Sequence, residues 1–142
     1  FIKIGQSLEN LILSGKREIK LGHTTPTRDL TFVKDTARGF IAIANTPSFN
    51  GEVTNIGMNE EISVGDLATL IAEIIGEKIS IITDEVRVRP DKSEVERLWC
   101  NNEKITRHTP WKPQYNLKSG LEETVVFLRK HLHLYKPEIY NV

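Results

Sequence analysis

The spacing of hydrophobic residues predicts alternating helices and strands along the chain. The clearest helix covers residues 63–76, where Ser63 and Asp66 have the spacing of a capping box and Gly76 supplies a helix stop. The apolar residues inside it recur at helical spacing and form one wide stripe: Leu67, Leu70, Ile71, Ile74 and Ile75. This stripe predicts a helix that packs against another element.

Four further helices are expected. Residues 1–15 and 101–108 have helical spacing, and a last helix after residue 113 places four leucines and valines inward: Leu121, Val125, Leu128 and Leu132. The fourth begins at Asp35, which we expect to cap it, and its apolar residues again recur at helical spacing: Ala37, Phe40, Ile41 and Ala44. Because residues 1–15 have no cap before them, we expect the chain to be part of a longer protein.

Strands are predicted between these helices. In residues 18–21, Ile19 and Leu21 share one face while the charged residues share the other, which is the period-two pattern of a strand. The runs LTFV, EVTNIG, ISII and VRVR also have strand-like composition, and EVERLW fits either a strand or a helix start. The alternation of helices and strands predicts an α/β fold with a small sheet and about five helices.

Composition narrows the class of protein. The 142 residues suit one folding unit, and equal numbers of basic and acidic residues give a formal charge of zero. No overall field therefore attracts nucleic acid or an anionic membrane, and no apolar run is long enough to span a bilayer. A single cysteine excludes an intramolecular disulfide and suits a reducing compartment. We expect a cytoplasmic protein whose partners are neither nucleic acid nor membrane.

The stretch VRVRPDKSEVERLWC contains the strongest candidate binding chemistry. Arg87 and Arg89 stand two apart, so in a strand both guanidinium groups would lie on one face, roughly 6 to 7 Å apart. Arginine binds phosphate oxygens through paired donors, and this spacing suits a diphosphate. Neighbouring acidic residues also permit surface ion pairs without any ligand. Both interpretations stay open from the residues alone.

Three motifs in order resemble one protein family. The segments RDLTFVKDTARGFIAIA, EVTNIGMNEEISVGDLATLIAEIIG and RVRPDKSEV…NNEKI…WKP are similar to the extended short-chain dehydrogenase/reductases. Within that family the pattern is most similar to nucleotide-sugar 4,6-dehydratases of the UDP-N-acetylglucosamine type. The resemblance implies that residues 1–142 form the nucleotide-sugar-binding C-terminal portion of a Rossmann-type enzyme, and that the dinucleotide-binding domain is absent from this chain.

The resemblance also suggests substrate-binding residues. By position, Arg28 and Arg89 would grip the diphosphate of a nucleotide-diphosphate sugar, with Arg87 as a neighbour or ion-pair partner. Leu21 occupies the position where relatives often place an aromatic residue against the nucleobase. Glu94 matches the acidic residue of the family's arginine segment, although this chain is two residues longer there.

The family's reaction implies a function for the parent protein. Such an enzyme, a lyase, oxidises the sugar at C4 with NAD, eliminates water across C5 and C6, and returns the hydride at C6. These 142 residues contain neither the glycine-rich turn that binds NAD nor the Tyr-x-x-x-Lys pair. The resemblance therefore implies that NAD is bound by the missing N-terminal portion, that this chain alone is inactive, and that the full-length protein is a homodimer.

Two alternatives remain for the function. One is a nucleotide-sugar 4-epimerase of the same family, and the other is a non-catalytic module that binds nucleotide sugars or another protein. A GxxGxxG turn and a Tyr-x-x-x-Lys pair upstream of Phe1 would favour an enzyme.

Other chemically notable residues have simpler explanations. Trp99 and Trp111 are expected to pack in the core or the lobe and not to act as stacking platforms, and Cys100 is expected to be a buried small hydrophobic residue. His131 and His133 would point to different faces of a helix, so we expect no metal site.

Overall fold

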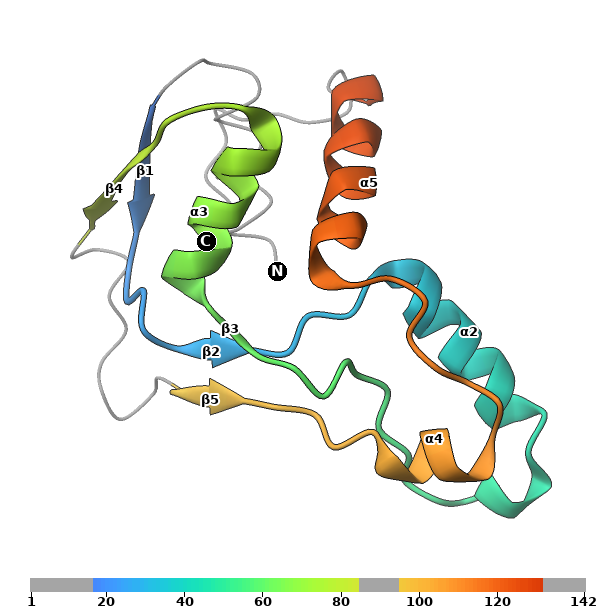
Figure 1. Ribbon diagram of the computed structural model, residues 1–142. Helices are drawn as coiled ribbons and strands as arrows, with labels where there is room; N and C mark the ends of the chain where they lie inside the picture. The colour runs from blue at the N-terminus through green and yellow to red at the C-terminus, as the bar shows by residue number, and fades with distance from the viewer. Residues whose placement is uncertain (1–16, 85–94, 132–142) are drawn as a thin grey trace. The chain divides into compact units, whose positions relative to one another are not determined.

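The computed structural model describes residues 17–84 and 95–131 (Figure 1). Its elements follow one another along the chain in this order: β1 (Glu18–Leu21), β2 (Thr27–Arg28), α2 (Val33–Ala44), the 3-10 helix η1 (Pro47–Phe49), β3 (Ile62–Ser63), α3 (Val64–Ile75), β4 (Ser80–Thr83), β5 (Arg97–Leu98), α4 (Glu103–His108) and α5 (Leu117–Lys130). They form two compact units, with described residues 17–25, 64–84 and 121–131 in the first and 26–63 and 95–120 in the second. The fold is α/β, as the sequence predicted.

The first unit is built on a parallel pair of strands. β1 pairs with β4 from Glu18 opposite Ser80 to Leu21 opposite Thr83. The inward residues of β1, Ile19 and Leu21, are buried and pack with Ala68 of α3. The period-two pattern therefore predicted both this strand and its buried face, and the run ISII is confirmed as β4.

The helix α3 also follows its sequence signals. It begins directly after Ser63 and ends before Gly76, whose φ of 83° lies in the left-handed region that glycine adopts without strain. The N–H groups of Gly76 and Glu77 both donate to the carbonyl oxygen of Ala72, which closes the helix end. Buried residues on α3 belong to the predicted stripe and its immediate neighbours: Leu67, Ala68, Ile71 and Ala72.

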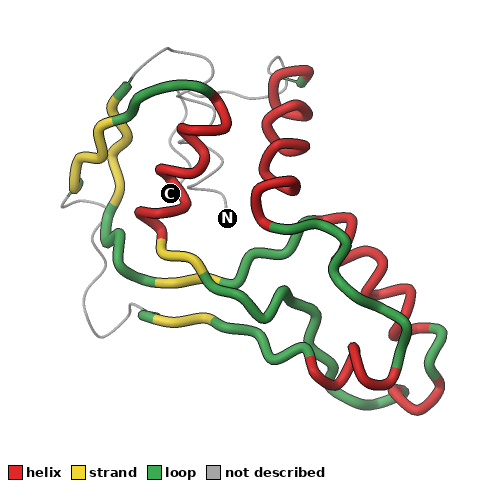
Figure 2. Tube along the Cα trace, in the orientation of Figure 1, coloured by secondary structure: helices red, strands yellow, loops and turns green. Residues whose placement is uncertain are grey.

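The second unit contains a three-stranded sheet in the order β3-β2-β5. β2 is the central strand, antiparallel to β3 and parallel to β5. The core of this unit consists of Phe49, Ile105 and Trp111, with Ala42, Ile43 and Ile56 packed against it. Much of the remaining chain in this unit is loop (Figure 2).

Two predicted strands in this unit are wrong. The run LTFV is split, because Val33 already starts α2, and the strand instead lies earlier at Thr27–Arg28. EVTNIG forms no strand, since within residues 17–84 and 95–131 no neighbouring strand pairs with it. Strand-forming residues need a backbone partner before they become a strand. The segment VRVR lies outside the described residues.

Helix α2 is present, but its predicted apolar stripe does not form the buried face. Phe40 and Ile41 are 65% and 61% exposed, whereas Gly39 is buried. A Cβ atom added at Gly39 would lie 2.8 Å from the side chain of Ile56, so the helix approaches that loop closely on its glycine side. Periodicity located this helix without identifying the face that packs.

The last two helices agree with the sequence more closely. Val125 and Leu128 of α5 are buried, as predicted, whereas Leu121 is only partly buried and Leu132 lies outside the described residues. Asn102 takes the cap position of α4, but the side-chain oxygen that accepts the N–H of Glu103, over 2.9 Å, belongs to Asn101. β5 resolves the ambiguity of EVERLW in favour of a strand.

In the parts of the chain that the structure describes, every helix is too short or too polar to cross a membrane.

Candidate functional site

Arg28 lies on the central strand of the second unit. Its backbone is opposite Ile62 of β3 on one side and Leu98 of β5 on the other. The guanidinium donates a hydrogen bond to the carbonyl oxygen of Thr27 over 2.7 Å, which uses one of its five N–H donors. Because β2 is paired on both sides, the backbone position of Arg28 is fixed.

On one face of this sheet, the carboxylate of Glu61 binds two neighbouring side chains. Thr27 and Arg97 are register partners, and both bind Glu61: the threonine hydroxyl donates over 2.6 Å, and two guanidinium nitrogens of Arg97 donate over 2.6–3.0 Å. These hydrogen bonds, first those from Arg97 and then that from Thr27, lower the pKa of Glu61. Because side chains alternate along a strand, Arg28 projects to the other face.

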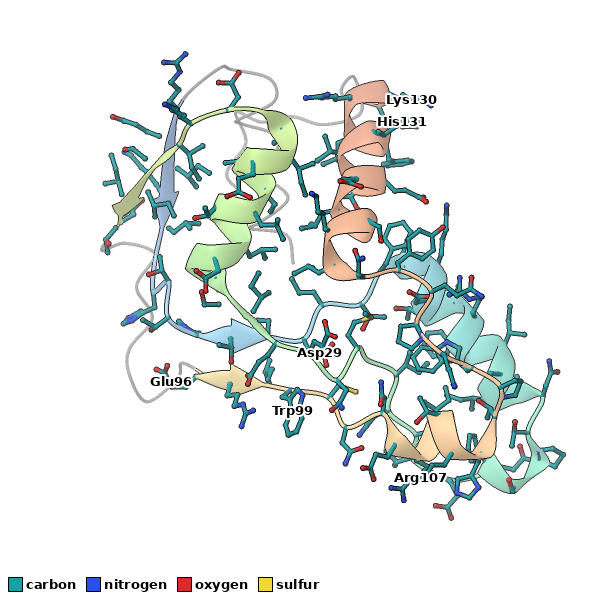
Figure 3. The ribbon with its side chains drawn as sticks, in the orientation of Figure 1. Asp29, Glu96, Trp99, Arg107, Lys130 and His131 are labelled. Carbon is teal, nitrogen blue, oxygen red and sulfur yellow. The ribbon has the colours of Figure 1, made fainter. Side chains whose placement is uncertain are left out.

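The two tryptophans differ in environment. Trp111 is 5% exposed in the core, and its indole N–H donates to the carbonyl oxygen of Asp35 over 3.0 Å. Trp99 is 51% exposed, and the guanidinium of Arg97 lies over its ring, 4.8 Å from the ring centre. Figure 3 shows Trp99 pointing away from β2 on the far side of β5. The expectation of a packed side chain is therefore confirmed for Trp111 and wrong for Trp99.

Asp29 directly follows β2 (Figure 3), and its carboxylate accepts hydrogen bonds from backbone N–H groups of two other segments. Its carboxylate accepts hydrogen bonds from Met58 at 2.9 Å, Asn59 at 2.8 Å and Cys100 at 3.3 Å. Its own N–H donates to the carbonyl oxygen of Leu98 over 2.9 Å. The residue after Arg28 thus joins β2 to the loop at 57–59 and to the chain that follows β5.

Gly57 and Cys100 are in close contact beside this carboxylate. A Cβ atom at Gly57 would lie 2.3 Å from the Cβ of Cys100, so only glycine fits there. The carbonyl oxygen of Gly57 accepts a hydrogen bond from the buried side chain of Asn102 over 2.8 Å. Burial, together with the nearby charge of Asp29, raises the pKa of the Cys100 thiol. Cys100 is only partly buried, so the expectation of a buried residue is wrong.

Asp35 has a different role from the predicted helix cap. Phe32 takes the cap position of α2, and Asp35 is the third residue of the helix with no exposed surface. Its carboxylate accepts the N–H groups of Gln114 and Tyr115 over 3.0 and 3.1 Å and contacts the guanidinium of Arg38. The cap prediction is wrong because a distant loop, and not the helix's own first turn, supplies the donors.

The remaining predicted site residues divide into two groups. Leu21 is 7% exposed and packs with Ile19 and Ala68, so little of its side chain is available to contact a ligand. Its contact with a nucleobase stays a prediction. Arg87, Arg89 and Glu94 lie outside the described residues. The pairing of Arg28 with Arg89 around one diphosphate therefore stays a prediction.

Sequence reasoning missed the connecting roles of Asp29 and Glu61. Both residues act through partners more than 25 positions away in the chain, so no local pattern identifies those partners. The only local signal was the pairing of Arg28 with Asp29 in the TRD motif.

The known proteins to which this chain is similar are nucleotide-sugar dehydratases and epimerases. The family model described as GDP-mannose 4,6 dehydratase matches residues 3–124. A UDP-glucose 4-epimerase from Mycolicibacterium smegmatis is 30% identical over 83% of this chain and 36% of its own length. The mouse dTDP-D-glucose 4,6-dehydratase is 32% identical over 77% of this chain and 31% of its own length. The chain thus spans about a third of the length of the curated relatives it matches.

The solved structures that resemble this chain also include nucleotide-sugar dehydratases and epimerases. The dTDP-glucose 4,6-dehydratase of Bacillus anthracis, in complex with NAD, matches with a TM-score of 0.74 and 27% identity, over 92% of this chain and 40% of that chain. The UDP-glucuronic acid 4-epimerase of Bacillus cereus, in complex with UDP-glucuronic acid and NAD, matches with a TM-score of 0.73 and 27% identity, over 91% and 39%. The chain therefore belongs to the GDP-mannose 4,6-dehydratase family, within the nucleotide-sugar dehydratases and epimerases of the extended short-chain dehydrogenase/reductases.

Proposed function

We propose that this chain is the nucleotide-sugar-binding portion of an NAD-dependent nucleotide-sugar 4,6-dehydratase, and that UDP-N-acetylglucosamine is the substrate. The observation that carries the proposal is the placement of Arg28 on the central strand β2, with backbone pairing on both sides. The paired strand holds the backbone at Arg28, and the planar guanidinium can bind a phosphate through paired N–H donors. Arg89 completes the contact with the pyrophosphate in this proposal, with Arg87 and Glu94 close to it.

Membership of the family supports the general class of ligand, since the 4-epimerase of Bacillus cereus forms a complex with UDP-glucuronic acid. The specific choice of UDP-N-acetylglucosamine rests on the sequence motif RPDKSEVERLWC. We further propose that the full-length protein is a cytoplasmic homodimer whose partners include neither nucleic acid nor membranes.

The residues of this chain do not fit NAD. None of its nine glycines stands three positions from another, as the GxxGxxG turn requires, and no lysine follows a tyrosine at four positions. We therefore propose that NAD, which supplies hydride chemistry when bound, is held by a portion of the protein outside these 142 residues. The role of this chain is to bind and orient the sugar nucleotide, and it is inactive alone.

A 4-epimerase of the same family is the second candidate function. It is favoured by relatives such as the UDP-glucose 4-epimerase of Mycolicibacterium smegmatis. Incubation of the full-length protein with UDP-N-acetylglucosamine separates the two, because a dehydratase yields a 4-keto-6-deoxy sugar with loss of water and an epimerase yields an isomer of unchanged mass.

Substitution at Arg28 tests the binding role directly. Calorimetry of the full-length protein with UDP-N-acetylglucosamine should show that Arg28→Lys weakens binding about tenfold, because a bidentate contact is lost. Arg107→Ala is the matched control, since Arg107 forms an exposed ion pair with Glu103 on α4. Equal affinity of the wild-type protein and Arg28→Lys would exclude Arg28 as a phosphate ligand, and a non-binding wild-type protein would exclude the substrate.

A further inference from the structure

The carboxylate of Asp29 organises the backbone around Arg28. It accepts N–H groups from Met58, Asn59 and Cys100 at 2.8–3.3 Å. Three donors from two segments fix the carboxylate in position and direction, because each bond restricts a different part of the chain. The end of β2 is therefore tied both by its sheet partners and by this side chain.

One of these donors belongs to a residue with an unusual backbone conformation. Asn59 has a φ of 60° and is the one non-glycine residue with positive φ among residues 17–84 and 95–131. Asparagine adopts this left-handed conformation more readily than other non-glycine residues, and surrounding contacts can hold it there. The bond from the N–H of Asn59 to Asp29 is one such contact. The loop thus turns through a left-handed residue at the point where it meets the carboxylate.

A carboxylate beside an anion-binding arginine would normally repel a phosphate. The three backbone N–H dipoles point their positive ends at the carboxylate and so reduce its repulsion of an anion at the neighbouring residue. Asp29 can therefore hold the end of the strand beside an anion-binding arginine.

We propose that Asp29 is a positioning residue for nucleotide-sugar binding: by fixing the end of β2 it sets the direction in which Arg28 meets the pyrophosphate. This inference rests on the proposed function. Asp29 touches neither the substrate nor the reacting atoms, and its effect on binding passes through Arg28. The loop at 57–59 and the chain around Cys100 supply the N–H donors that hold the Asp29 carboxylate.

A double-mutant cycle in the full-length protein tests this role. The variants are Asp29→Asn, Arg28→Ala and the double variant, and calorimetry measures the Kd of UDP for each. Asp29→Asn replaces one carboxylate oxygen by an NH2 group, which cannot accept a backbone N–H, so at least one hydrogen bond is lost. We expect Arg28→Ala to raise the Kd at least about tenfold and Asp29→Asn to raise it about threefold to tenfold.

Coupling between the two changes is the decisive readout. If Asp29 acts through Arg28, then Asp29→Asn leaves the Kd unchanged once Arg28 is already alanine. A purely structural role would instead raise the Kd by the same factor in both backgrounds, and this result would overturn the inference. Binding of uridine, which lacks phosphate, should be unaffected by Asp29→Asn and provides a second readout.

Two controls keep the outcomes distinct. Glu103→Gln changes an exposed carboxylate that pairs with Arg107 on α4, and it should leave the Kd of UDP unchanged. Thermal unfolding of each variant shows whether it is folded at the temperature of the calorimetry, and Asp29→Glu replaces Asp29→Asn if the latter is not. An unchanged Kd in Arg28→Ala would refute the proposed function itself, whereas a weakened Arg28→Ala with additive effects would refute only the role of Asp29.

Discussion

The carboxylate of Asp35 accepts a hydrogen bond from the main-chain N–H of Tyr115, 80 residues further along the chain, over 3.1 Å. The same carboxylate accepts the N–H of Gln114 and contacts Arg38, and it has no exposed surface. This buried group therefore connects the start of α2 to the segment that precedes α5. The TRDLTFVKD motif contributes two such connecting carboxylates, Asp29 and Asp35.

Removal of the Asp35 carboxylate should destabilise the protein strongly. Asp35→Ala leaves two backbone N–H groups and a partly buried guanidinium without their acceptor, and we expect the free energy of unfolding to fall by about 3 kcal/mol. Urea denaturation measures this change. Glu103→Ala, which removes an exposed ion pair with Arg107, should change it by less than about 1 kcal/mol. Similar losses in the two variants would contradict the structural role of Asp35.

A methyl group at Gly57 should be poorly tolerated. Gly57→Ala would place its Cβ 2.3 Å from the Cβ of Cys100, and relief of this overlap should cost about 1–3 kcal/mol. The midpoint of thermal unfolding should fall accordingly. Addition of Cys100→Gly removes the atoms that clash, so the double variant should lose less than the sum of the two single changes. Strict additivity would show that the contact is unimportant.

The Glu61–Arg97 pair should make stability depend on pH in the acid range. Hydrogen bonds from Arg97 and Thr27 lower the pKa of Glu61 from its ordinary value of 4.5 in the folded protein. A lowered folded-state pKa means that the contribution to stability is complete above pH 4.5 and is lost as pH falls through the folded-state pKa. Wild-type protein should therefore exceed Glu61→Gln in stability at about pH 7, and the difference should vanish in strong acid.

Denaturant unfolding at several pH values checks this expectation. Because the pair is exposed to solvent, added salt should reduce the difference at about pH 7. A difference between wild-type protein and Glu61→Gln that persists unchanged at about pH 2 would rule out the ionised pair as its source.

The apolar residues on the exposed side of α2 should be replaceable. Phe40 and Ile41 are 65% and 61% exposed, so Phe40→Ser with Ile41→Ser removes little buried surface. We expect the free energy of unfolding to change by less than about 1 kcal/mol, with weaker binding of a hydrophobic dye. Ile105→Ser is the contrasting variant, because Ile105 has no exposed surface and its loss should cost at least about 2 kcal/mol. Strong destabilisation by the Phe40 and Ile41 changes would show that this face is packed.

Local patterns predicted several elements correctly. Alternation identified β1 and its buried residues, and the capping signals with Gly76 marked both ends of α3. The motif order also suggested the family that comparison with known proteins supports. These successes have a common cause, because strand alternation, helix periodicity and glycine conformation depend on near neighbours in the chain.

Interactions between distant segments decided the rest. EVTNIG has strand-forming residues without a paired strand among residues 17–84 and 95–131, and α2 packs on Gly39 because Ile56 lies there. Asp29 and Asp35 bind backbone N–H groups supplied by loops far along the chain.

The sequence by itself determined the α/β class, the main helices and the family motifs, since each depends on spacing over a few residues. Only the tertiary structure decided which face of α2 packs, which donors surround each aspartate, and that Arg28 stands on a strand paired on both sides. The physical reason is that a hydrogen bond or a packed contact requires two partners, and local sequence describes only one of them.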